Sequence, residues 1–377
     1  MSKEEREKVI LDCPRKELLE AVQLAGTPAT GRQTTIPIFG SLLVEAKDNQ
    51  LRLVGCDGEM WVERVVPSMV TETGTVTLNA RLLQDILGRL PDGDVHLEQT
   101  NSSSVLMSLG HSDFKMVVGN HPDDFPTVPG VAASAQISLG FEAFREAVES
   151  VKFAVAPETQ GRPILTGILF SYDGEKLHTV ATDTHRLAVH SKPFSSIGDT
   201  VDAVIPLRAL NVIERLPVPD DAEIVLTLGE GKVVVETDGA KVVSQLLEGN
   251  FPPYQRVIPD SYIRRWVIAR EELTDALRRE LILAKENSNR IILSSSGDRL
   301  EMRARSEGLG EATDVLDIVA EGDDLEIAFN GRYLLDALEA MKSESVSLEL
   351  TENDRPAVLK PAEEDPSFLC VIMPMAM

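Results

Sequence analysis

The sequence repeats one pattern of helices and strands three times, at intervals of about 125 residues. Each copy begins with an amphipathic helix in which Leu18, Phe144 and Leu273 hold the same position. A strand hairpin follows, and then a second helix that begins near residues 80, 207 and 331. Because three landmarks recur in one order, the chain is predicted to use one fold in tandem. Such a repeat favours assembly or encirclement over a single catalytic cleft.

The predicted fold class is α+β, with each copy made of two helices packed on antiparallel sheets of about eight strands. We expect three domains, at residues 1–130 with a short N-terminal extension, at 136–257 and at 262–377. Proline-rich segments at 126–135 and 252–260 are the predicted linkers. The sheet edges of one copy are expected to pair with those of the next, since an open edge must be managed.

Charge and composition limit the possible partners. The chain carries 61 acidic against 37 basic residues, a net charge of −24, which on average argues against a protein that grips phosphates. A protein that surrounds DNA without gripping it can still be acidic overall. No apolar run reaches the ~18–20 residues of a membrane helix, and three cysteines without CxxC spacing indicate a reducing compartment. We therefore expect a cytoplasmic protein with no membrane segment, no cofactor and no metal.

Two segments carry unusual chemistry. Asp183, His185 and Arg186 follow a predicted strand, and two interpretations stay open: a polar turn, or the Asp–His pair of a metal-assisted hydrolase or phosphatase for which no nucleophile is evident. The apolar C-terminus at 368–377 is predicted to be a core strand that Pro374 ends, since proline has no N–H. Methionines beyond that point suit adaptable contacts with partners. The turn at 229–232 lacks the spacing of a phosphate-binding loop.

Several phrases in order resemble the bacterial sliding clamp family, the beta subunit of the replicative DNA polymerase. They lie at residues 35–40, 180–189, 249–257, 329–336 and 371–375, on a frame that matches from about Val9 to Met377. The resemblance implies a head-to-tail homodimer that closes a ring of six domains around double-stranded DNA. Helices would line the hole. Such a clamp confers processivity topologically and is not an enzyme; a scaffold that never meets DNA is the remaining rival.

The resemblance also implies partners and the residues that meet them. A peptide of the replicative polymerase catalytic subunit, the clamp loader or another protein with a clamp-binding motif would enter a groove between the second and third copies. The residues expected to line this groove are Leu165, Thr182, Thr184, His185, Arg186, Leu187, Pro252, Arg256, Val257, Val371, Met373, Pro374 and Met375. Thr184 departs from the glycine common in the family and is expected to narrow the groove, and Ala376 replaces a residue that is often basic.

Two further sets follow from the resemblance. The expected DNA-facing residues are Arg32, Arg81, Arg208 and Arg332. The expected apolar centre of the dimer contact is Phe114 and Met116 on one end and Ile282 and Leu283 on the other. The residues at 163–164 replace an aromatic pair that would stack on DNA, and His111 and Asp113 stand where basic residues are frequent, so charge pairing at the dimer contact is expected to be rearranged.

Overall fold

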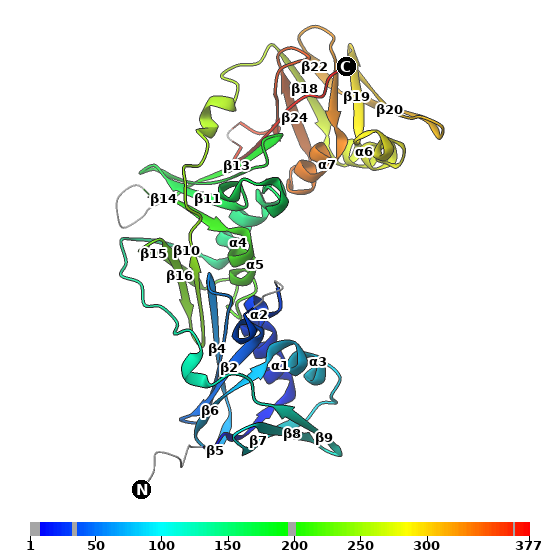
Figure 1. Cartoon of the computed structure of the whole chain (residues 1–377). Helices are drawn as coiled ribbons and strands as arrows, with labels where there is room; N and C mark the ends of the chain where they lie inside the picture. Colours follow the sequence, from blue (N-terminus) through cyan, green and yellow to red (C-terminus); the bar gives the residue numbers. More distant parts are fainter. Residues whose placement is uncertain (1–7, 32–35, 195–200, 365) are drawn as a thin grey trace. The chain divides into compact units, whose positions relative to one another are not determined.

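The computed structural model describes residues 8–31, 36–194, 201–364 and 366–377 (Figure 1). It forms two compact units, residues 1–141 with 208–246 and residues 142–207 with 247–377, and the boundary between them passes through the second copy of the repeat. None of the described helices is long and apolar enough to cross a membrane. The repeat predicted from the sequence is confirmed, because the same order of strands and helices recurs three times.

The first repeat contains two strand meanders, and a helix precedes each of them in the sequence. Its elements are β1 (Ile10–Pro14), α1 (Arg15–Ala25), α2 (Thr27–Gly31), β2 (Ser41–Lys47), β3 (Gln50–Cys56), β4 (Met60–Pro67), β5 (Met69–Glu72), β6 (Gly74–Asn79), α3 (Ala80–Leu87), β7 (Asp94–Asn101), β8 (Ser104–Leu109) and β9 (Ser112–Val117). Helix α1 precedes β2–β4, and α3 precedes β7–β9. The apolar face of α1, with Leu18 and Val22, packs against β4 and α3. The side chain of Asn79 accepts a hydrogen bond from the Leu82 amide and so caps α3.

The second repeat follows the same plan. Its elements are β10 (Ala135–Gly140), α4 (Phe141–Glu149), β11 (Gly167–Tyr172), β12 (Lys176–Thr182), β13 (Arg186–Pro193), β14 (Val201–Pro206), α5 (Leu207–Ile213), β15 (Glu223–Gly229), β16 (Lys232–Thr237) and β17 (Ala240–Gln245). Residues 229–232 form the β15–β16 hairpin turn, as the sequence predicts.

The third repeat is the most regular. Its elements are β18 (Arg264–Ala269), α6 (Arg270–Ala284), β19 (Arg290–Ser296), β20 (Arg299–Ser306), β21 (Gly310–Asp317), β22 (Val319–Glu321), β23 (Glu326–Asn330), α7 (Gly331–Glu339), β24 (Ser345–Leu350), β25 (Ala357–Pro361) and β26 (Phe368–Ile372). Asn330 caps α7 as Asn79 caps α3, with its side chain accepting from the Arg332 amide. The two caps hold equivalent positions and explain why both helices begin where they do.

Four antiparallel sheets connect these elements, and two of them cross from one repeat into the next. In the first unit, the eight strands run β10-β15-β16-β17-β4-β3-β2-β6, so β17 of the second repeat pairs with β4 of the first. In the second unit, nine strands run β14-β11-β12-β13-β26-β25-β24-β18-β22, so β26 of the third repeat pairs with β13 of the second. The expected edge-to-edge pairing of tandem copies is confirmed at both junctions.

The other two sheets stay within one repeat. The five-stranded sheet β5-β1-β7-β8-β9 belongs to the first repeat, and β9 is one of its edges. The four-stranded sheet β21-β20-β19-β23 belongs to the third repeat, and β21 is one of its edges.

Helix α6 buries a carboxylate beside the β21 edge. The Glu280 side chain is 0 % exposed, and neither carboxylate oxygen has a hydrogen-bond partner of normal geometry. The pKa of Glu280 is raised to about 7, mainly by burial and then by the nearby Asp314 carboxylate on β21, against smaller opposite effects of the Ala304 backbone and Arg279. Since the charged form is the costly one, Glu280 is expected to be neutral at low pH and to destabilise the fold once it ionises.

We expect Glu280→Gln to raise the free energy of unfolding at pH 8 and to change it little at pH 5. The folded-state pKa lies above the ordinary value of 4.5, so the wild type loses stability as pH rises toward about 7. The gain at pH 8 should be about 2–3 kcal/mol, measured by urea unfolding at both pH values. Glu339→Gln, at an exposed ion pair with Arg278, is the control and should show no such pH dependence. A gain of equal size at pH 5 and pH 8 would contradict this account.

Candidate partner-binding and ring-closing surfaces

The C-terminal residues lie beside the β12–β13 turn in the second unit. Strand pairing sets Arg186 opposite Ile372 and Leu187 opposite Val371. Beyond the end of β26, the Met373 amide donates to the His185 carbonyl oxygen at 2.9 Å. The Met375 amide donates to Ala328 of β23 at 2.8 Å. Backbone hydrogen bonds on either side of Pro374 therefore hold the tail at two points, and the regular strand ends before this proline, as the sequence predicts.

An apolar cluster underlies this region. Leu187 and Val371 are buried together with Tyr254 of the short 3-10 helix Tyr254–Val257. That cluster brings the linker segment after the second repeat onto the same sheet face as the tail. Leu165 is fully buried as well, whereas its neighbour Ile164 packs against the cluster. Leu165, Leu187 and Val371 thus serve as core, and they can meet a ligand only if the residues above them move.

The exposed residues above this cluster form what we call the tail surface: Thr184, His185, Pro252, Arg256, Val257 and Met373. Met373 is 44 % exposed and Val257 is 49 % exposed, so two apolar side chains adjoining this cluster in sequence are open to solvent. Pro374 and Met375 are half-buried next to them. Backbone pairing and the shared core therefore bring together most of the residues that the sequence assigns to the groove.

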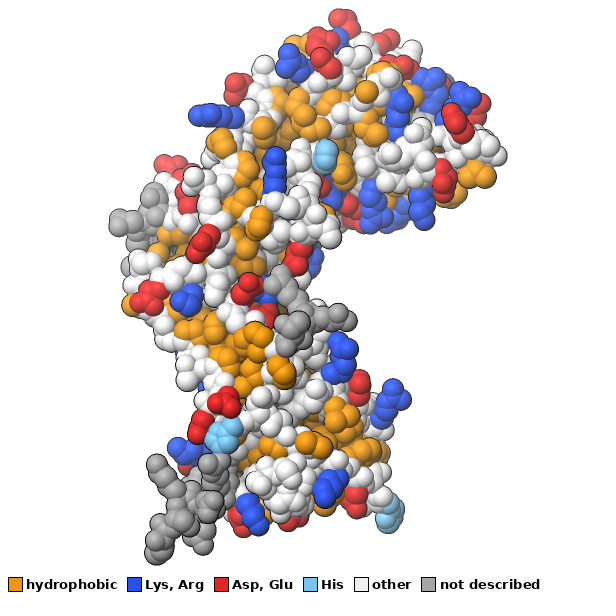
Figure 2. Space-filling model, in the orientation of Figure 1, with side chains coloured by type: hydrophobic (Ala, Val, Ile, Leu, Met, Phe, Trp, Pro, Cys, Tyr) orange, Lys and Arg blue, Asp and Glu red, His pale blue; other side chains and the backbone are white. Residues whose placement is uncertain are grey.

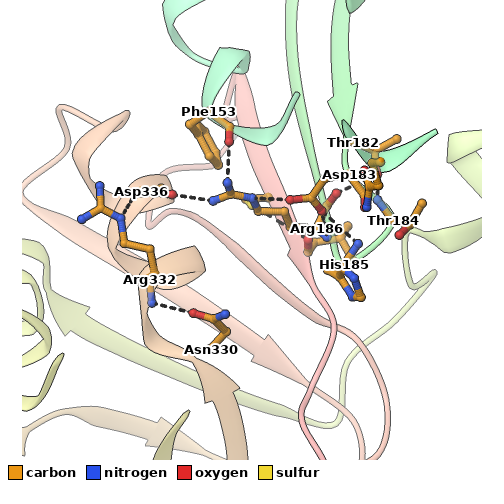
Figure 3. A network of polar contacts seen from close by, with 12 residues as sticks. Phe153, Thr182, Asp183, Thr184, His185, Arg186, Asn330, Arg332 and Asp336 are labelled. Atoms are coloured by element: carbon orange, nitrogen blue, oxygen red, sulfur yellow. Dashed lines mark hydrogen bonds and ion pairs between the residues drawn. The ribbon is translucent and has the colours of Figure 1, made fainter. Parts of the chain in front are cut away.

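Arg186, one of the residues expected to line the groove, directs its hydrogen bonds into the protein. Its guanidinium donates to Asp183 at 3.1 Å, to Asp336 of α7 at 2.7 Å and to the Phe153 carbonyl oxygen at 2.5 Å (Figure 3). Its guanidinium carbon also lies 4.4 Å from the centre of the Tyr333 ring. The side chain is only 10 % exposed. Because its donors are engaged inside the protein, Arg186 orders the turn and α7 rather than presenting free hydrogen bonds.

The turn that carries His185 is fixed by its neighbours. One oxygen of Asp183 accepts from the His185 and Arg186 amides, at 2.9 and 3.0 Å. Its other oxygen accepts from the Arg186 side chain, and the His185 ring stacks on Tyr333 with ring centres 6.3 Å apart. Of the two interpretations that the sequence leaves open, this geometry is that of a polar turn. Among the described residues, no group of three or more His, Cys, Asp or Glu side chains is placed to hold a metal.

Three residues of this network were missed by the sequence analysis: Phe153, Tyr333 and Asp336. The spacing of Arg332 and Asp336 on one helix face does predict their ion pair, which is 2.7 Å long. Nothing in the sequence indicates that Asp336 also binds Arg186, which lies 150 positions away. That contact depends on the β13–β26 pairing.

The arginines expected to face DNA are mostly engaged with the protein itself. Arg208 pairs with Asp57 and Glu59, and Arg332 pairs with Asp336. Arg81 is exposed and donates to the Thr30 carbonyl oxygen at 3.3 Å. Arg32 lies outside the described residues. Acidic partners therefore offset much of the positive charge that these helices carry.

The residues expected at the dimer contact separate into exposed and buried ones. Ile282 of α6 is 74 % exposed, and Leu283 and Phe114 are half-buried. Met116 does not belong to an exposed patch, because its side chain is 3 % exposed and packs in the core of the first repeat. On β9 the exposed apolar residue is instead Val117, at 76 %.

Three comparisons with known proteins agree. The family models of the DNA polymerase III beta subunit match the chain as its N-terminal domain at residues 9–129, its central domain at 138–253 and its C-terminal domain at 255–376. The "Beta sliding clamp" of Staphylococcus aureus (strain MW2) is 31% identical over 359 residues, which is 92% of this chain and 94% of that protein. The same values hold for the protein of that description from Staphylococcus epidermidis.

Solved structures give the same result. The DNA polymerase sliding clamp of Pseudomonas aeruginosa has a TM-score of 0.89 at 29% identity, over 98% of this chain and 100% of that one. A putative DNA polymerase III beta subunit from Eubacterium rectale has a TM-score of 0.90 at 27% identity over the same shares. With three consecutive family domains, a triplicated fold and these relatives, the chain belongs to the DNA polymerase III beta subunit family, the bacterial sliding clamps.

Proposed function

We propose that two copies of this chain close head to tail into a ring around duplex DNA and hold the replicative polymerase there through the tail surface. As a member of its family the chain is a processivity factor and not a catalyst. The observation that carries the proposal is a pair of strand edges, β9 and β21, left open by an otherwise regular pattern of junctions.

The repeat itself indicates which edges should meet. Each repeat has two meanders, one after each of its main helices. At both junctions, the last strand of the first meander in one repeat pairs with the last strand of the second meander in the following repeat. Those pairs are β4 with β17 and β13 with β26. The equivalent strands that remain are β21 of the third repeat and β9 of the first. Antiparallel pairing of β21 with β9 of a second copy would complete the series, and two such contacts close a ring.

Exposed apolar side chains accompany these two edges. Val117 lies on β9, Val315 lies on β21 and is 53 % exposed, and Ile282 lies on α6, which packs against β21. An open edge with apolar neighbours would promote uncontrolled association if no partner covered it. A second copy covers both edges at once, which is why we propose residues Phe114, Ile282 and Leu283 as parts of one contact.

DNA would be held by closure rather than by affinity. The chain has a net charge of −24, and acidic side chains pair Arg208 and Arg332. The protein can then neutralise few DNA phosphates and release few of their counterions, so direct binding is expected to be weak and to vanish at moderate salt. Weak contact suits a ring that must slide. We propose Arg81 and Arg332 as DNA-facing residues because both remain exposed at helices of equivalent position.

The tail surface is the proposed site for partners. Apolar side chains are exposed at many points on the face drawn in Figure 2. In the tail surface, Met373 and Val257 are exposed beside a buried apolar cluster. Extended peptides with apolar side chains bind such surfaces, and flexible methionines can adapt to several of them. Accordingly we propose that the polymerase catalytic subunit, the clamp loader and other proteins with a clamp-binding motif use this site in turn, in the cytoplasm.

The dimer contact can be tested by charge. We expect Ile282→Asp combined with Leu283→Asp to give a folded protein of one chain, because buried carboxylates weaken an apolar contact by several kcal/mol. Light scattering at micromolar concentration should give about twice 41.2 kDa for the wild type and about 41.2 kDa for the variant, with unchanged circular dichroism. Met69→Asp, at an exposed position on the opposite edge of the first repeat's sheet, should stay dimeric. A wild-type mass of one chain would refute the ring.

Removal of residues 373–377 tests the partner site. The deletion removes the exposed methionines and two tail hydrogen bonds but leaves β26 in place. The affinity for a fluorescent apolar peptide from the polymerase should fall at least tenfold, or about 1.4 kcal/mol, while the dimer persists. Met373→Ala should show part of the loss and Val319→Ala, an exposed apolar control outside the tail surface, none. Unchanged affinity after the deletion would show that the tail is only a terminal segment.

A further inference from the structure

Thr184 has a backbone conformation that its side chain opposes. Its φ is +78°. Among the described residues, the other non-glycine residues with positive φ are Asp48, Asn49, Glu230, Ser288 and Asn289, and none of these is β-branched. Asparagine and aspartate tolerate this region, whereas a β-branched residue there is strained because its Cβ substituents crowd the backbone.

The strain comes from the place of Thr184 in the turn. Thr184 and His185 are the two central residues of the β12–β13 hairpin, between Asp183 and Arg186, whose backbones are hydrogen-bonded at 3.3 Å. The first central residue has positive φ and the second does not. Glycine adopts positive φ at such a position without steric cost, because it has no Cβ. Glycine at 184 would therefore relieve strain without changing the turn.

The fold itself makes little use of the Thr184 side chain. The hydrogen bonds that hold the turn come from its neighbours: Thr182 Oγ1 accepts from the Thr184 amide at 3.1 Å, and Asp183 accepts from the next two amides. The Thr184 hydroxyl makes no hydrogen bond within the described part of the chain. Figure 3 shows its side chain directed away from the Arg186 network, and the residue is exposed. Because the Thr184 side chain makes no hydrogen bond that would offset the strain, contact with another molecule is the better explanation for a threonine at this position.

We infer that Thr184 is a specificity-determining residue. It limits the size of the peptide side chain that can lie against the β12–β13 turn when a partner occupies the tail surface. The inference rests on the proposed function of the tail surface. His185, which follows Thr184, accepts a hydrogen bond from the Met373 amide, so the branched Cβ stands at the rim of that surface. Its methyl and hydroxyl groups occupy space that glycine would leave open. The preferred partner is an extended apolar peptide with a small residue at this point.

The experiment compares wild type, Thr184→Gly and Thr184→Ala against peptides of the polymerase segment in which each position in turn is Ala or Leu. Wild type should prefer Ala over Leu at least tenfold at one position. Thr184→Gly should reduce that preference below threefold and raise the unfolding midpoint by roughly 2–4 °C. Thr184→Ala, which keeps a Cβ and part of the strain, should be intermediate in both. Glu230→Gly, at a positive-φ turn of the first unit, is the control and should leave every affinity unchanged.

The outcomes separate the inference from the proposal on which it rests. Peptide binding that depends on residues 373–377, with the same Ala-to-Leu preferences in wild type and Thr184→Gly, would overturn the role of Thr184 alone. A Thr184→Gly protein that is less stable than wild type would overturn the claim that the turn is strained. Binding that survives deletion of residues 373–377, or no binding by wild type, would overturn the partner site and the inference with it.

Discussion

Antiparallel pairing between the last strands of successive repeats is the interaction on which this architecture depends. At β4–β17 and at β13–β26, an edge that would otherwise expose a row of backbone donors and acceptors is satisfied by the next repeat. Each pairing also continues an apolar sheet face, with Val62 opposite Val242 at one junction and Ala188 opposite Cys370 at the other. Of the strands that take part in this pattern, β21 and β9 are each left with one edge unpaired in the described part of the chain, and the proposed partner for both is a second copy.

The second junction also builds the tail surface. Because β13 pairs with β26, the Asp183–Arg186 turn lies next to the C-terminal residues, and Arg186 reaches Asp336 of α7. Asp336 in turn holds Arg332, an exposed arginine on the same helix. The buried Arg186 guanidinium thus links the turn to α7. Met373 is hydrogen-bonded to this turn and is exposed beside it. A surface that is already ordered pays no ordering cost of its own when a peptide binds.

The sequence predicts the parts of this molecule that follow from periodicity and local chemistry. The repeat, the helices that begin after Asn79 and Asn330, and the end of the last strand before Pro374 are all present as expected. The family resemblance to sliding clamps is confirmed. Contacts between distant segments could not be predicted, because they depend on strand order: the Arg186–Asp336 pair, the Arg208 pairs with the 57–59 turn and the burial of Met116 are examples. The strain at Thr184 could not be predicted from the sequence either, because it is recognised only from the backbone φ angle of that residue.

A closed ring and an ordinary DNA-binding protein differ most clearly in what releases them. The direct measurement loads the protein with its clamp loader onto nicked circular DNA, separates bound from free protein by gel filtration at a salt concentration that abolishes simple binding, and then linearises the circle at constant salt. The account predicts retention on the circle, because the apolar ring contact is not weakened by salt, and release on linearisation. Equal retention on circular and linear DNA, or loss from both at the same salt concentration, would contradict it.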